Sequence, residues 1–291
     1  MKKLGILTIH GIGKVPRYYA NGFIGSIKYL IGKDESDIAF GSIYYQNTQQ
    51  ANEERIWNRY SENKLDWREA RKFLLFGIAD ATSLEHSKHD FESNYILAQL
   101  EIAKELQAIR SELSADAPII IIADSLGGHV LSCYLWDAQA YNSKTRRGFN
   151  GFWQRPQPYF KEIIGSEPSN KDIAWLQGGN IQKIVTTGCN IPIFVASQAE
   201  DAIMPISPPR KDFEWLNYFD RDDVLGWPLQ PLSNDYHKLV TDIPVKLRGP
   251  SLRSRFYYSW NPLVHKLYWK DPTFKQALAD QIIRTLKTTN N

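Results

Sequence analysis

A run of four isoleucines occupies positions 119–122, between Pro118 and Ala123. A short run that is apolar and β-branched at every position is typical of a strand covered on both faces. Beyond it, apolar residues recur at helical spacing: Val130, Leu131, Tyr134 and Leu135. The pattern therefore predicts a strand, a sharp turn with Ser125 at its tip, and a helix.

The same patterns alternate along the rest of the chain. Strands are predicted at 4–9, 38–45, 181–187, 215–219 and 243–247, and amphipathic helices at 18–31, 93–113 and 271–287. Polar residues at 46–72 predict two further helices, 82–91 has loop composition, and 193–196 extends the preceding strand or forms a short one. Strands that alternate with helices predict an α/β fold with a mostly parallel central sheet flanked by helices.

A long segment at 137–180 interrupts this alternation. It is rich in Gly, Pro, Asn and aromatic residues, and loops of this length in compact domains are usually functional or mobile. Two interpretations stay open: an inserted cap or lid, or a surface excursion whose aromatic side chains pack on the domain. With no internal repeat and no domain boundary, residues 1–291 are expected to form one domain with this insertion.

Composition narrows the function classes. The formal net charge of +3 is small and scattered, which argues against a nucleic-acid partner. The N-terminal apolar run at 4–9 is too short for a signal peptide, and no apolar run approaches the length of a membrane span. Cys133 on a predicted helix and Cys189 after a predicted strand do not indicate a disulfide. We therefore expect a cytoplasmic protein with no integral membrane association.

Small residues surround the serine of the central turn. In a tight strand-to-helix turn, side chains two positions before and after Ser125 would collide, and Ala123 and Gly127 occupy those positions. The helix that follows directs its unpaired N–H groups toward the serine, so the N–H of Leu126 is placed to stabilise an oxyanion.

This segment, Ala-Asp-Ser-Leu-Gly-Gly at 123–128, resembles the G-x-S-x-G nucleophile elbow of the alpha/beta-hydrolase superfamily, in its serine esterase and lipase branch. Ala123 replaces the first glycine, and Asp124 stands where His or Tyr is usual. In that family a strand that ends in His-Gly supplies the second half of the oxyanion hole. The resemblance thus implies that the N–H of Ile12, or less readily that of Gly11, is the second donor. The substrate-pocket candidates are His10, Gly11, Asp124 and His129, and a packing role is open for His129.

The loop at 11–14 also has the glycine spacing of a phosphate-binding loop. A dinucleotide fingerprint would need a third glycine at position 16, which is Pro16, and no Gly-Lys-Ser or Gly-Lys-Thr is present. The nucleotide interpretation therefore fails.

Family members carry the serine, the acid and the histidine in this chain order, with the histidine on the loop after the last strand. His265 fits that place better than His237, and 259–269 resembles the S-H-x-x-Y-W segment of some bacterial members. The acid should follow the penultimate strand, where 222–226 resembles the D-x-V turn of relatives. We choose Asp222, with Asp223 next and Asp201 third.

Together these features predict a serine hydrolase that cleaves a carboxylic ester, thioester or amide through an acyl-enzyme. The expected triad is Ser125, His265 and Asp222, with Ile12 and Leu126 as backbone donors. The alternatives are an acyltransferase on the same fold, a non-catalytic binding protein, and a lipase if 149–160 forms an apolar lid. No metal and no organic cofactor are implied, and the partner is a small-molecule acyl substrate, lipids included.

Overall fold

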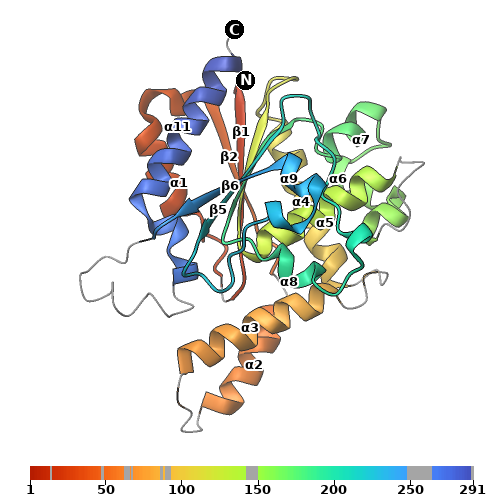
Figure 1. Ribbon diagram of the computed structural model, residues 1–291. Coiled ribbons are helices and arrows are strands. Elements are labelled where there is room, and N and C mark those ends of the chain that lie inside the picture. Colours follow the sequence, from red (N-terminus) through yellow and green to blue (C-terminus); the bar gives the residue numbers. More distant parts are fainter. Residues whose placement is uncertain are drawn as a thin grey trace.

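A six-stranded sheet in the order β2-β1-β3-β4-β5-β6 forms the centre of the molecule, and every neighbouring pair of strands is parallel. The computed structural model describes residues 1–13, 15–46, 49–61, 66, 68–85, 88, 93–141, 150–247 and 264–289. The strands are β1 (Leu4–Ile9), β2 (Ile38–Ile43), β3 (Ile119–Asp124), β4 (Ile181–Thr187), β5 (Glu214–Asp220) and β6 (Val240–Val245). The predicted α/β class with a parallel central sheet is confirmed (Figure 1).

Helices cover both faces of this sheet. On one face lie α1 (Asn21–Ile31) and α11 (Pro272–Thr289), and on the other lie α4 (Asn94–Arg110), α5 (Leu126–Tyr141), α6 (Gln157–Ile164), α7 (Asn170–Leu176), α8 (Ile191–Val195) and α9 (Asn234–Leu239) (Figure 1). The remaining helices among the described residues are α2 (Gln49–Ser61) and α3 (Arg68–Glu85). Short 3₁₀ segments are η1 (Gly32–Asp37), η2 (Gly151–Gln154), η3 (Glu200–Ala202), η4 (Gln230–Leu232), η5 (Val264–Lys266) and η6 (Tyr268–Lys270).

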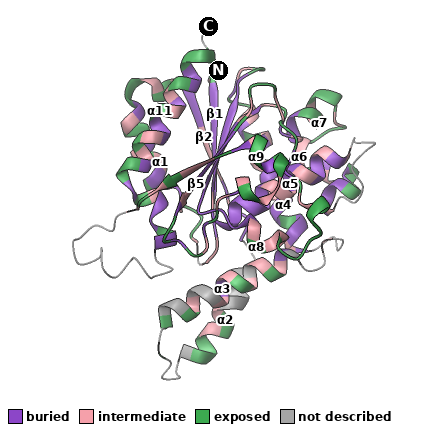
Figure 2. Cartoon of the chain, in the orientation of Figure 1, coloured by how far each residue is buried: buried purple, intermediate pink, exposed green. Residues whose placement is uncertain are grey.

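The isoleucine run of β3 shows why every position there is apolar. Ile119 and Ile121 belong to the larger buried cluster on one face of the sheet, and Ile120 and Ile122 to the smaller cluster on the other. Successive side chains of a strand point to opposite faces, so a strand buried on both sides needs an apolar residue at each place. Figure 2 shows the strands as the buried centre between the two helical layers.

Two short elements differ from the sequence prediction. Residues 191–195 form α8 and not a strand, because Pro192 occupies its first turn, where a missing N–H costs nothing. The last strand runs from Val240 to Val245, so it begins three residues and ends two residues earlier than predicted. It lies at the sheet edge, where Pro244 is tolerated.

The prediction of a loop at 82–91 is partly wrong, since α3 continues to Glu85. Residues 86, 87 and 89–92 lie outside the described residues, as do 248–263, which include part of the 259–269 segment. Figure 1 shows α2 and α3 projecting as a pair beyond the end of the sheet where the strands terminate.

Aromatic side chains of the 137–180 segment are buried where they are described. Phe152 and Trp153 are fully buried and Phe160 is 2% exposed, and all three belong to the larger core cluster. Residues 142–149 lie outside the described part of the chain. A cap or lid function for 137–180 stays a prediction.

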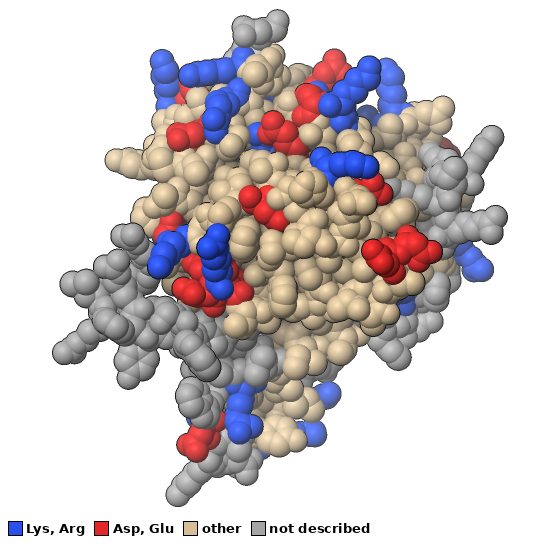
Figure 3. Space-filling view, in the orientation of Figure 1, with Lys and Arg blue, Asp and Glu red and all other residues tan. Residues whose placement is uncertain are grey.

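The described surface is mixed in charge, with Lys and Arg interspersed among Asp and Glu on the face seen in Figure 3. Within the described ranges, no helix combines the length and the apolar character that crossing a bilayer requires. Among the same residues, no group of three or more His, Cys, Asp or Glu side chains is arranged to hold a metal ion.

Candidate active site

Ser125 lies in a left-handed backbone conformation at the turn between β3 and α5. Its φ is 50°, and it is the one non-glycine residue with positive φ in the described part of the chain. Left-handed backbone is costly for a residue with a Cβ, and it persists where the surroundings enforce it. Here the Ser125 N–H donates to the Thr187 carbonyl oxygen of the next strand at 2.8 Å, and the Ser125 carbonyl accepts from the Gly128 N–H at 3.0 Å. The predicted strained turn is present.

The glycine after the serine is explained by a close backbone approach. A Cβ at Gly127 would lie 2.5 Å from the His10 carbonyl oxygen and 3.0 Å from that of Ile9. Gly11 is equally constrained, because its Cβ would lie 2.7 Å from the Ser125 Cβ. The loop after β1 therefore packs directly on the elbow, which brings the two expected oxyanion donors to the same end of the sheet.

His10 is held inside the protein. Its ring stacks on Tyr45 with centroids 4.1 Å apart, its Nδ1 is 2.9 Å from the Gly11 carbonyl oxygen, and its Nε2 accepts from the Tyr45 N–H at 3.3 Å. Burial lowers the pKa of His10 to about 4, so the imidazole is neutral and Nδ1 carries the proton. This geometry favours a role in holding the loop at Gly11 over direct contact with substrate.

The side chains of Ser125 and His265 meet although they are 140 residues apart in the chain. The His265 Nε2 lies 2.6 Å from the Ser125 Oγ, and the two residues are 3% and 1% exposed. His265 belongs to η5, between the last strand and α11. A base at this distance can accept the serine proton directly.

The acidic partner of His265 is Asp223, so the choice of Asp222 was wrong by one position. The Asp223 Oδ2 lies 2.8 Å from the His265 Nδ1, whereas Asp222 is exposed and its N–H donates to the Asp220 Oδ1 at 2.9 Å. Asp220 also accepts from the Leu247 N–H at 2.6 Å. Asp220 thereby shapes the turn, and the turn directs the next buried carboxylate, that of Asp223, at the histidine.

Tyr268 is a residue of this site that the sequence prediction did not include. Its hydroxyl donates to the Asp223 Oδ2 at 2.9 Å and accepts from the Asp220 N–H at 2.8 Å. The other Asp223 oxygen accepts from the Leu225 N–H at 3.0 Å. The signal was available, because Tyr268 is the tyrosine of the 259–269 segment, three residues after His265.

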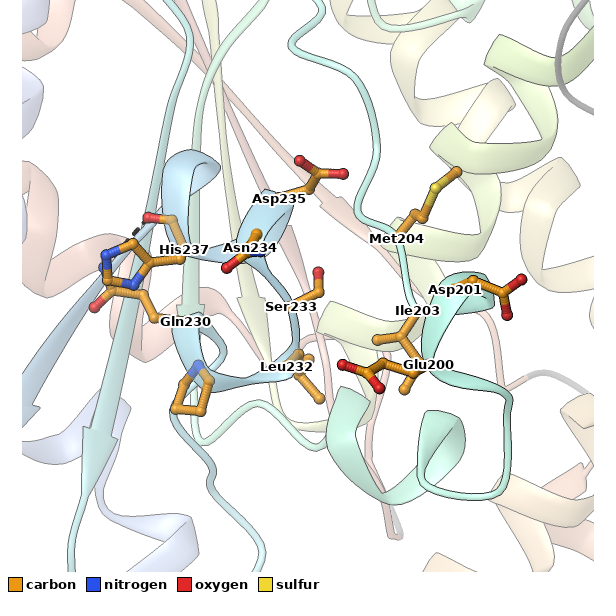
Figure 4. A pocket seen from close by; sticks show the side chains of 11 residues that line it. Glu200, Asp201, Ile203, Met204, Gln230, Leu232, Ser233, Asn234, Asp235 and His237 are labelled. Atoms are coloured by element: carbon orange, nitrogen blue, oxygen red, sulfur yellow. Dashed lines mark hydrogen bonds between the residues drawn. The ribbon is translucent and has the colours of Figure 1, made fainter.

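The other candidates for base and acid lie elsewhere. His237 is exposed on α9, and Asp201 is exposed on η3. Both line an open hollow of about 750 Å³ between these elements, which Figure 4 shows with Glu200 and Asp235 on its walls. His129 is buried on α5, stacked on Phe194 at 3.8 Å between centroids.

Asp124 places a second carboxyl group beside the serine. Its Oδ1 accepts from the Thr187 Oγ1 at 2.7 Å, and its Oδ2 would lie 3.3 Å from a Cβ at Gly11. Burial raises the pKa of Asp124 to about 6, and the nearby Asp223 carboxylate acts in the same direction, while His265 and the Thr187 hydrogen bond oppose the rise. The elbow therefore carries an acid that titrates close to neutral pH.

The described sheet and site have the arrangement that the resemblance to alpha/beta hydrolases implied: a serine after β3, an acid after β5 and a histidine between β6 and α11. No protein-family model and no curated protein sequence matches this chain.

Solved structures with a similar arrangement include the C6-C4 SN3 inhibited esterase B from Lactobacillus rhamnosis, at 11% identity and a TM-score of 0.47 over 99% of this chain and 78% of that chain. A second structure of esterase B from Lactobacillus rhamnosis has 11% identity and a TM-score of 0.47, covering 99% of this chain and 76% of that one. A structure reported for the metagenome-derived lipolytic enzymes LipS and LipT has 10% identity and a TM-score of 0.38, with 84% of each chain covered. At these values the likenesses carry no assignment of activity, which rests on the geometry of this chain.

Proposed function

We propose that the chain is a serine hydrolase that cleaves a carboxylic ester, thioester or amide through an acyl-enzyme. The observation that carries the proposal is the continuous hydrogen-bonded series from the Ser125 Oγ through His265 to the Asp223 Oδ2, with contacts of 2.6 and 2.8 Å. A serine hydroxyl is a weak nucleophile unless a base takes its proton and a carboxylate holds that base in the correct tautomer.

In the proposed reaction, the Ser125 Oγ attacks the carbonyl carbon as the His265 Nε2 takes its proton. Asp223 accepts from the Nδ1–H of His265 and stabilises the imidazolium that forms. The N–H groups of Leu126 and Ile12 stabilise the oxyanion, and loss of one such donor typically lowers the rate by about 10²–10³. His265 then protonates the leaving group, and water attacks the acyl-enzyme by the reverse proton transfers.

A fluorophosphonate probe tests the proposal, because it reacts covalently with activated serines. We expect wild-type protein to be labelled, Ser125→Ala to show no labelling, and His265→Ala to be labelled at least 100-fold more slowly. His237→Ala, on the exposed face of α9, is the matched control and should be labelled at the wild-type rate. Folded wild-type protein that takes no label would contradict the proposal and favour a binding protein.

Transfer to an alcohol in place of water is the alternative reaction of the same acyl-enzyme. Adding methanol to an ester assay separates the two, since a hydrolase forms mainly the free acid and an acyltransferase mainly the methyl ester.

The lipase alternative requires an apolar lid at 149–160. Because the side chains of Phe152, Trp153 and Phe160 are buried, they argue against an interfacial lid at these residues. Emulsified substrate should therefore give no rate increase over the same ester in solution.

A further inference from the structure

Helix α3 packs on the loop that carries the second proposed oxyanion donor. The pair α2 and α3 lies at the end of the sheet where the strands terminate, which is also the end where Ser125 follows β3 (Figure 1). A Cβ at Gly77 of α3 would lie 2.8 Å from the Ile12 Cδ1, and the next nearest atoms among the described residues, at 3.8 and 3.9 Å, also belong to Ile12. The backbone of α3 therefore lies directly against the end of the Ile12 side chain.

The part of α3 that carries Gly77 is fixed to the rest of the domain. Phe76 is 1% exposed, and Leu84 is 2% exposed and belongs to the larger core cluster. Helix α3 cannot move away from Ile12 without exposing these side chains to water, which is unfavourable. The Ile12 Cδ1 is, in contrast, the free end of a flexible side chain that is only half-buried. A group added at Gly77 would therefore displace Ile12 and leave the helix in place.

The position of Ile12 matters because it lies between two glycines. Gly11 and Gly13 have no side chains, and the φ of Gly13 is 97°, so the backbone on either side of Ile12 has few conformational restrictions of its own. The Gly11 carbonyl oxygen accepts from the His10 Nδ1 at 2.9 Å. In a trans peptide the Ile12 N–H points in the opposite direction. His10 thus holds the oxygen side of this peptide unit, and the Ile12 side chain anchors its nitrogen side.

We propose that Gly77 is a positioning residue for the reaction: it leaves the space that the Ile12 side chain occupies, and this contact directs the Ile12 N–H at the oxyanion. The inference rests on the proposed serine hydrolase, in which the N–H groups of Ile12 and Leu126 are the donors. Leu126 belongs to the elbow itself, whereas the Ile12 donor depends on a helix inserted between β2 and α4. A displaced donor stabilises the transition state less without weakening substrate binding, so the loss should appear in kcat and not in KM.

An exchange of one methyl group across this contact tests the proposal. Gly77→Ala adds a carbon against the Ile12 Cδ1, and Ile12→Val removes that same atom. On p-nitrophenyl acetate, we expect Gly77→Ala to lower kcat about tenfold with KM changed by less than about twofold, which is less than the complete loss of one donor. Ile12→Val leaves the contact unfilled and should lower kcat about threefold. The double variant restores the packing, so its kcat should exceed that of either single variant.

Melting temperatures separate positioning from folding. Alanine is more favourable than glycine inside a helix, so Gly77→Ala should melt at or above the wild-type temperature while its kcat falls. Gly25→Ala in α1, where a Cβ would meet nothing within 4 Å, is the matched control and should keep the wild-type kcat. All rates are measured below the melting transition of every variant, so that unfolded protein does not contribute to the difference.

Two outcomes would overturn the role of Gly77: a Gly77→Ala variant with the wild-type kcat, or a double variant that is no faster than Gly77→Ala. Failure of the hydrolase proposal looks different. In that case the wild-type protein neither reacts with the fluorophosphonate probe at Ser125 nor hydrolyses p-nitrophenyl acetate.

Discussion

Two loops of the candidate site, the elbow around Ser125 and the acid loop after β5, differ in what determines which residues can occupy their functional positions. At the elbow, the residue types next to Ser125 are restricted by the close approach of the elbow backbone to the end of β1 and the loop after it. This approach allows only small residues at Gly11 and Gly127. In the acid loop after β5, several aspartates satisfy every local rule, and hydrogen bonds from residues 27 to 45 positions later select among them. The comparison teaches that steric restrictions are visible in a short motif, whereas the direction of a carboxylate depends on distant partners.

The largest expected effect separates neighbouring aspartates of the acid loop. Asp223→Asn should lower kcat by about 10⁴, because an amide that donates to Nδ1 would hold His265 in the wrong tautomer. Asp222→Asn, which replaces an exposed side chain, should change kcat by less than twofold. Steady-state kinetics on p-nitrophenyl acetate measures both. The opposite ranking would return the acid to Asp222 and remove the distinction between the two loops.

The same distinction explains what could be predicted from the sequence. The isoleucine run, the elbow and the choice of His265 over His237 follow from local patterns and chain order. Asp223 could not be separated from Asp222, since the partners that orient it, Tyr268 and His265, join it only in the folded chain. The short α8 was mistaken for a strand because an apolar run of this length has no clear period, and Pro192 was its one helical signal.

The steric restriction at the elbow can be tested with one methyl group. Gly127→Ala places a Cβ against two carbonyl oxygens of the backbone, which cannot move aside as a flexible side chain would. We expect the free energy of unfolding to fall by about 3 kcal/mol, at the upper end of overpacking costs. Urea unfolding measures it. Gly25→Ala in α1 is the control, since a Cβ there meets nothing within 4 Å and alanine favours a helix by up to about 1 kcal/mol.

Asp124 should make the stability of the elbow depend on pH. Its carboxyl is neutral in both states below about pH 4, and between about pH 4 and 6 only the unfolded chain ionises, because burial raises the folded-state pKa from 3.8 to about 6. The free energy of unfolding therefore falls as pH rises through this window and stays lower above it. At 1.36 kcal/mol per pKa unit, the loss is at most about 3 kcal/mol.

Asp124→Asn removes this loss and keeps an oxygen for the Thr187 hydroxyl. Its advantage over wild type should be nearly absent at about pH 3 and grow to at most about 3 kcal/mol at about pH 7, in urea titrations at each pH. The same substitution at Asp222, which is exposed, is the matched control. An Asp124→Asn curve parallel to wild type across the range would show that the elbow carboxyl is not buried in the folded protein.

The smallest expected effect tests whether distant hydrogen bonds orient the acid. Tyr268→Phe leaves the aromatic ring in place and removes both the donor to Asp223 and the acceptor for the Asp220 N–H. We expect kcat to fall about tenfold with KM unchanged, since one hydrogen bond to a charged group contributes about 1.5–3 kcal/mol and the His265 and Leu225 contacts remain. Tyr29→Phe, at an 86% exposed position, is the matched control. If Tyr268→Phe lowers the melting temperature but leaves kcat at the wild-type value, the tyrosine only packs the loop, and the remaining contacts are sufficient to orient Asp223.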